Sequence, residues 1–319
     1  MNTNPFESDY DTKHFIARFI ELSGKANENP LYENIDRLDN MRIRHIVSIF
    51  FLGTYLYNNV KPINDSIDKV ISRFKKQNPN SKIEFSFVWF LICLFHDLGY
   101  SIEDRENYND FDEFINGKVK YFLKEKVGVP SFYEDVYKNY FNFRLKSTNN
   151  FIRKPDHGIC GGIILYNKLN EILLSKQKNK KSEGLSWNKK LLNIYRYASW
   201  VILSHNIFFI RKGDRDEQVY KENKLDALIL DEGQTSKIDL RKHGFLYLFM
   251  LVDTIDPIKK VKTFNNLNMI KCNVENNLIT LEIEDDNLRE KYFKKVLELR
   301  QWLIPDIRLI NKRVQIRIK

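Results

Sequence analysis

Histidines next to acidic residues are the part of this sequence best suited to chemistry. Only six histidines occur, and the pair His96-Asp97 directly follows the apolar run FSFVWFLICLF. Imidazole and carboxylate are ligand types that suit a divalent transition metal. A carboxylate buried without a partner is costly, and a metal ion is a natural partner for Asp97. Gly99 would let the chain turn sharply after the ligands. Taken alone, a His-Asp pair is more often a helix cap beside a packed histidine.

Two further segments place a candidate ligand at the edge of an apolar helix. His45 lies in the first turns of the segment MRIRHIVSIFFLG, and Asp253 ends the run FMLVD. Asp256 comes three residues after Asp253, so it could share that helix face and orient a ligand. A solvated carboxylate at a helix end is the more common role, and we expect that role for Asp256.

The order of these residues resembles the HD phosphohydrolase superfamily. The local patterns also match: R-x-x-H before an apolar helix, an apolar run into HDLGY, and an apolar run into D-x-x-D. The resemblance covers residues 42–256. It implies that His45, His96, Asp97 and Asp253 hold one metal ion.

Two more histidines fit an elaborated version of this pattern. His157 precedes an expected helix and His205 ends one. Resemblance to the two-metal HD proteins, such as HD-GYP and related cyclic-dinucleotide phosphodiesterases, implies that Asp97 bridges to a second metal held by His157 and His205. We expect these three residues to act in catalysis. The chain lacks the doubled histidine and the Gly-Tyr-Pro signature usual in HD-GYP domains, so the metal count stays open. Other roles stay open for these two histidines: His157 could cap the helix, His205 could pack in the core, and either could contact the substrate.

A divalent metal in such a site would produce a nucleophile for phosphoryl chemistry. It lowers the pKa of bound water from 15.7 to about 7, and the resulting hydroxide can attack phosphorus. The resemblance implies iron, manganese, nickel, zinc or magnesium, and the imidazoles favour the first four over a site for magnesium alone. Arg42, one helical turn before His45, and Lys154 are the cations that we expect to bind substrate phosphate.

Composition and the motifs that are missing narrow the function classes. The net charge of +10 is compatible with a phosphorylated small molecule or nucleotide, and nucleic acid is a possible partner, although a solvated basic surface is a more common cause. There is no glycine-rich phosphate loop and no G-x-S-x-G elbow, which argues against P-loop enzymes and serine hydrolases. We expect a soluble cytoplasmic protein with no membrane contact. The three cysteines are scattered, there is no signal-peptide pattern, and the apolar runs are well below the ~20 residues of a membrane span.

The periodicity of apolar residues predicts a mainly α protein. Recurrence at spacings of three and four indicates helices over residues 14–22, 42–57, 63–75, 86–98, 110–126, 131–143, 158–174, 186–205 and 240–254. After residue 260, the alternating segments MIKCNVE and LITLEIE predict a β-hairpin, followed by a helix over residues 286–303 and a last strand over residues 307–319. We therefore expect an HD-type helical bundle over residues 12–260 and a small C-terminal ββαβ (α+β) appendage over residues 261–319.

Three functions are compatible with these observations. The first is a metal-dependent phosphohydrolase that cleaves a phosphate ester or anhydride of a nucleotide-like substrate. The second is an HD nuclease or a cyclic-dinucleotide phosphodiesterase, which the extra histidines favour. The third is a non-catalytic HD sensor or interaction module, which the intact set of candidate ligands argues against.

Overall fold

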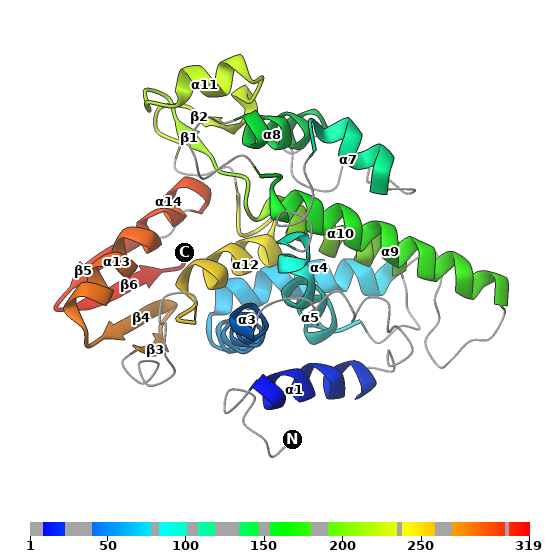
Figure 1. The fold of residues 1–319 in the computed structure, drawn as a ribbon. Helices are drawn as coiled ribbons and strands as arrows, with labels where there is room; N and C mark the ends of the chain where they lie inside the picture. Colours follow the sequence, from blue (N-terminus) through cyan, green and yellow to red (C-terminus); the bar gives the residue numbers. More distant parts are fainter. Residues whose placement is uncertain are drawn as a thin grey trace.

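The computed structural model describes residues 9–22, 40–77, 83–100, 108–118, 134–146, 154–179, 191–234, 238–258, 270–303 and 306–319. Most of the described residues are helical, and a four-stranded antiparallel sheet lies at the C-terminus (Figure 1). The helices are α1 (Asp9–Leu22), α3 (Asn40–Asn59), α4 (Lys61–Gln77), α5 (Phe85–Phe95), η1 (His96–Gly99), α7 (Phe111–Lys118), α8 (Glu134–Lys146), α9 (His157–Asn179), α10 (Leu191–Ser204), α11 (Glu217–Glu222), η2 (Asp226–Leu228), α12 (Gly244–Ile255), α13 (Asp286–Leu297) and α14 (Leu299–Trp302). The strands are β1 (Ile210–Arg211), β2 (Ile229–Leu230), β3 (Ile270–Glu275), β4 (Leu278–Ile283), β5 (Asp306–Ile310) and β6 (Arg313–Arg317).

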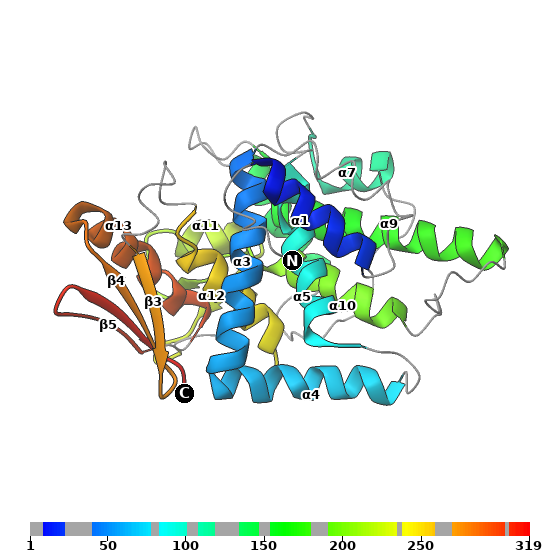
Figure 2. The same cartoon turned by 90° about the horizontal axis from the view of Figure 1, so that it is seen from below.

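The centre of the helical body consists of α5 and α12. Both helices are apolar on nearly every side, which is the pattern of a helix surrounded by others, and almost all of their residues are buried. They contact each other and are packed against by α3, α4 and α10. Figure 2 shows α3 between the C-terminal sheet and α5, in agreement with its contacts to both β3 and α5. The two central helices carry candidate ligands at their C-terminal ends.

Glycines bring the helices around the His-Asp pair unusually close together. A Cβ atom on Gly99 would lie 1.9 Å from the carbonyl oxygen of His157, and one on Gly162 would lie 2.4 Å from the carbonyl oxygen of Ser199. Gly99 therefore serves close packing of η1 on α9. The sharp turn expected at Gly99 is wrong, because this residue lies in a 3-10 helix and does not have a positive φ.

The C-terminal sheet has the strand order β3-β4-β6-β5, and every neighbouring pair is antiparallel. The hairpin expected from the alternating segments is confirmed, with Asn276 and Asn277 in its turn at φ 49° and 61°. The single last strand is wrong: residues 306–317 form a second hairpin, in which Asn311 and Lys312 have φ 49° and 64°. Two-residue turns of this kind need positive φ at both positions, and asparagine tolerates such values. The appendage is thus ββαββ in its strands and main helix, and the expected helix over residues 286–303 is divided at Glu298 into α13 and α14.

Other expectations agree with the structure to different degrees. The helices around residues 14–22, 42–57, 63–75, 86–98, 158–174 and 240–254 are confirmed within a few residues. Parts of the helices expected over residues 110–126, 131–143 and 186–205, and the boundary expected at residue 260, lie outside the described residues. In the part of the chain that is described, no helix has the length and apolar character needed to cross a membrane.

Candidate metal centre

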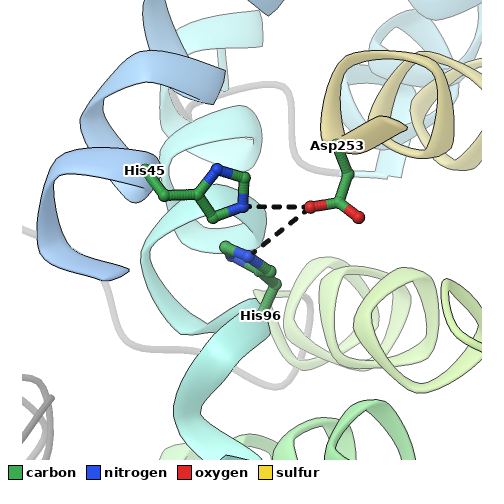
Figure 3. Close-up of side chains that lie close together, drawn as sticks. All are labelled: His45, His96 and Asp253. Carbon is green, nitrogen blue, oxygen red and sulfur yellow. Dashed lines mark hydrogen bonds and ion pairs between the residues drawn. The ribbon is translucent and has the colours of Figure 1, made fainter. Parts of the chain in front are cut away.

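Three predicted ligands from distant parts of the chain meet in one place. His45 comes from α3, His96 from η1 at the end of α5, and Asp253 from the last turn of α12 (Figure 3). The Nε2 atom of His45 lies 3.0 Å from Asp253 Oδ1, and the Nε2 atom of His96 lies 3.9 Å from the same oxygen. One ligand atom of each residue lies within 4.8 Å of the other two, so the group is close enough to hold a metal ion.

Asp97 lies directly beside this group. Its Oδ1 atom is 3.0 Å from His96 Nε2, and its side chain is almost completely buried. The four residues of the predicted one-metal site therefore lie together in the structure. Asp97 is not one of the three residues that satisfy the distance limit for a common ion, so its part in holding a metal remains a prediction.

One ring nitrogen of His96 donates a hydrogen bond, and the other faces carboxylate oxygens. A carbonyl oxygen only accepts hydrogen bonds, so the 2.8 Å contact from His96 Nδ1 to the Cys93 carbonyl places a proton on Nδ1. The other ring nitrogen, Nε2, is buried and forms no hydrogen bond with the described residues. It faces carboxylate oxygens of both Asp97 and Asp253. If the ring is neutral, the Nε2 lone pair faces negative oxygens, and a cation between them removes the repulsion.

The carboxylates outnumber the imidazoles in this buried group. The carboxylates of Asp97, Asp253 and Asp256 all lie against the rings of His45 and His96. Two imidazoles and carboxylates form the donor set of a divalent transition metal, and the residues present therefore fit such an ion.

Asp256 differs from the expectation of a solvated helix end. It is fully buried, and its Oδ2 atom accepts a hydrogen bond from Nδ1 of His45 at 2.7 Å. Its other oxygen accepts a hydrogen bond from the hydroxyl of Ser48. The expected solvated role was wrong because the C-terminal end of α12 packs against α3. Ser48 was missed, although its position three residues after His45 places it on the same helix face.

The other two candidate histidines form a second pair beside the first group. The ring centroids of His157 and His205 are 5.2 Å apart, and that of His205 is 5.8 Å from His96. His205 Nδ1 donates to the Ile202 carbonyl at 2.6 Å, so Nε2 carries the lone pair when this ring is neutral. The structure thus brings the four histidines of the predicted pattern into one continuous row. Neither His157 nor His205 belongs to the three-residue group that could share one ion.

Asp156 links the elements that carry this second pair. Its Oδ1 atom accepts from the backbone N–H of Ile159 at 3.0 Å, which caps the first turn of α9, and its Oδ2 atom accepts from the side chain of Asn206 at 2.7 Å. Burial raises the pKa of this carboxyl, while Arg144 and the hydrogen bonds oppose the increase. The cap is thus made by Asp156, and His157 is the first helical residue rather than the cap.

The two predicted phosphate-binding cations lie in different settings. The guanidinium carbon of Arg42 lies 3.4 Å from the ring centroid of Tyr100, and the His157 ring stacks on Tyr100 at 4.0 Å. Both groups cannot occupy one face of the ring at these distances, so Tyr100 lies between them. Lys154 is exposed, two residues before Asp156, and does not belong to the buried group.

Comparisons with protein-family models, with curated proteins and with solved structures find no match. The resemblance to HD proteins therefore depends on the residues and their order along the chain.

Proposed function

We propose that the chain is a metal-dependent phosphohydrolase of the HD type, which cleaves a phosphate ester or anhydride of a nucleotide-like substrate. The observation that carries the proposal is the meeting of His45, His96 and Asp253, whose ligand atoms lie close enough together to hold one metal ion. The order of these residues along the chain, with Asp97 beside them, adds the second support.

Each residue of the group has a separate task in this proposal. His45, His96 and Asp253 hold a divalent ion, with Asp97 beside it, and the imidazoles favour Mn, Fe, Ni or Zn over Mg alone. When bound, such an ion polarises a phosphoryl oxygen and lowers the pKa of a water molecule from 15.7 to about 7.

Arg42 is the cation that we assign to the substrate phosphate. Its guanidinium group is held flat over Tyr100, on the opposite side of the ring from His157. A planar guanidinium fixed in this way can form two parallel hydrogen bonds to a phosphate, which orients the substrate as well as neutralising its charge.

A phosphodiesterase is the second candidate, whether a nuclease or an enzyme acting on cyclic dinucleotides. The adjacent rings of His157 and His205, in line with His96, favour it. His157 and His205 would hold a second ion or a proton, which would supply positive charge for the leaving oxygen of a diester. The net charge of +10 is also compatible with a polynucleotide substrate.

The test is metal loading followed by a substrate panel. Protein stripped with EDTA and reloaded with Mn²⁺ or Fe²⁺ is expected to retain about one or two ions per chain after desalting, as one-metal and two-metal sites do. The loaded protein is then assayed with nucleotides, cyclic dinucleotides, single-stranded DNA and RNA, and aryl phosphates. Failure to retain any metal would overturn the proposal.

Hydrolysis of one substrate class decides between the two candidates, and the variant Asp97→Ala should abolish it. Activity that survives in this variant would place the chemistry elsewhere in the chain. A protein that retains metal and hydrolyses nothing in the panel would instead support a sensor or interaction module.

A further inference from the structure

A buried layer lies behind the candidate ligand His45. Ser48 and Asp256 form it, and neither belongs to the group that could hold the ion. The hydroxyl of Ser48 donates to Asp256 Oδ1, and Asp256 Oδ2 lies 2.7 Å from His45 Nδ1. All three side chains are buried, with relative exposures of 8% for Ser48, 0% for Asp256 and 2% for His45. Both carboxylate oxygens of Asp256 therefore have a donor.

The position of Asp256 is unfavourable unless it has a specific role. It is the C-cap residue of α12, where the helix dipole places about half a negative charge. A carboxylate both buried and next to that negative end is destabilising, and the hydrogen bonds from Ser48 and His45 offset that cost.

The contact with Asp256 also determines which nitrogen of His45 faces the ligand group. Ionised carboxylates only accept hydrogen bonds, so the 2.7 Å contact places a proton on Nδ1. Nε2 lies 3.0 Å from the other carboxylate, that of Asp253, so a proton on Nε2 can be shared only with that oxygen, and an ion bound by His45 and Asp253 takes the place of that proton. Without Asp256, the Nδ1 atom loses this acceptor while Nε2 keeps Asp253, so the proton of the neutral ring would move from Nδ1 to Nε2.

We propose that Asp256 and Ser48 are positioning residues of the centre, which hold His45 as the Nδ1–H tautomer and present its Nε2 atom to the ion. The inference rests on the proposed function for the identity of the ligand as a divalent metal. It goes beyond that function by assigning the affinity for the metal partly to a hydroxyl and a carboxylate that do not touch it. Ser48 orients the carboxylate, and the carboxylate orients the ring and makes it more basic.

The first measurement is Mn²⁺ affinity by calorimetry on metal-free protein. Asp256→Asn, which keeps the shape and removes the charge, should weaken Mn²⁺ binding by roughly tenfold to a hundredfold. Ser48→Ala should weaken it less, and Ser48→Thr, which keeps the hydroxyl, should restore it. The matched control is Ser66→Ala, because Ser66 is also a buried helix serine, whose hydroxyl donates to the carbonyl of Leu240, four residues before α12 begins. The control should bind Mn²⁺ like the wild type even if it loses stability.

The second measurement is the ¹⁵N chemical shifts of the His45 ring in metal-free protein, which do not depend on metal binding. The wild type should carry its proton on Nδ1, and Asp256→Ala should move it to Nε2. Unchanged Mn²⁺ affinity in folded Asp256→Asn and Ser48→Ala overturns the positioning role while leaving the metal site intact. A wild type that binds no Mn²⁺ overturns the proposed function instead. In that case the chemical shifts still test the positioning role. It is overturned if the wild type has no proton on Nδ1, or if the proton stays on Nδ1 in Asp256→Ala.

Discussion

Removing the Asp253 carboxylate should change stability little without metal and should remove most of the stabilisation that metal gives. Without metal, Asp253→Asn loses the 3.0 Å contact with His45 but also removes one of three crowded carboxylates. A hydrogen bond to a charged group contributes about 1.5–3 kcal/mol, and relief of like-charge repulsion offsets it, so we expect a net change below ~1.5 kcal/mol. With metal, the wild type gains the binding free energy and the variant does not.

The size of the metal effect follows from mass action. At a Mn²⁺ concentration of about 100 Kd, binding stabilises the wild type by about 2.7 kcal/mol. Unfolding entropies of about 2.1 cal/mol/K per residue give about 0.7 kcal/mol/K for a chain of 319 residues, so Tm should rise by about 4 °C. If Asp253→Asn binds about a hundredfold more weakly, the same Mn²⁺ concentration stabilises it by only about 0.4 kcal/mol, or less than ~1 °C.

The assay is thermal unfolding followed by circular dichroism in EDTA and in Mn²⁺. The control variant Asp231→Asn removes an exposed carboxylate elsewhere in the chain and should keep the full metal-induced shift. A folded Asp253→Asn with the same Mn²⁺-induced shift as the wild type would refute the assignment of this residue as a ligand.

Three further predictions concern the packing of η1 on α9, the cap of α9 and a buried histidine at the start of α12. Gly99→Ala should destabilise the fold by about 1–3 kcal/mol or more in urea unfolding, because its Cβ would lie 1.9 Å from the His157 carbonyl; a variant as stable as the wild type would contradict the close packing of η1 on α9. Asp156→Ala should cost about 2–4 kcal/mol, since it removes a helix cap of about 0.5–2 kcal/mol and leaves Asn206 without its buried acceptor; a cost limited to the cap would show that the Asn206 contact is not significant. His243 is buried at the start of α12, and burial lowers its pKa to about 4. Because the unfolded chain then binds more protons, its contribution to stability is complete above pH ~6.5 and is lost as the pH falls towards 4, by about 2 kcal/mol between pH 7 and pH 5. His243→Gln should reduce this pH dependence in urea titrations, and an identical slope in both proteins would refute it.

The sequence was sufficient for the helices around the site because their apolar residues either recur at helical spacing, as in α3, or make up nearly the whole segment, as in α5 and α12. The segments that carry His45, His96 and Asp253 all fold as expected, and each residue lies at the edge of a buried helix. Spacing alone could not place these three residues together, since they are separated by up to 208 positions. The resemblance to HD proteins supplied that prediction, and the distances agree with it.

Features that depend on how two elements pack were not predictable from one sequence. Asp256 could be assigned as buried only once the register of α12 on α3 was known, because its partners Ser48 and His45 lie on the other helix. Gly99 suggested a turn, whereas in the structure a side chain at this position would collide with the carbonyl oxygen of His157. The last hairpin was missed, although the alternation changes phase at Asn311 and Lys312: it places apolar residues at odd positions before this pair and at even positions after it.

The separation of 208 positions between His45 and Asp253 also constrains when the site can form. A contact between residues so far apart in the chain forms only after much of the chain has been ordered, because closing a long loop has a high entropic cost. During synthesis, α3 and α5 are complete long before α12 leaves the ribosome. If the centre holds the metal proposed for it, loading is therefore a late step of folding. An ion bound at that stage acts as a cross-link that joins the first and last thirds of the helical body.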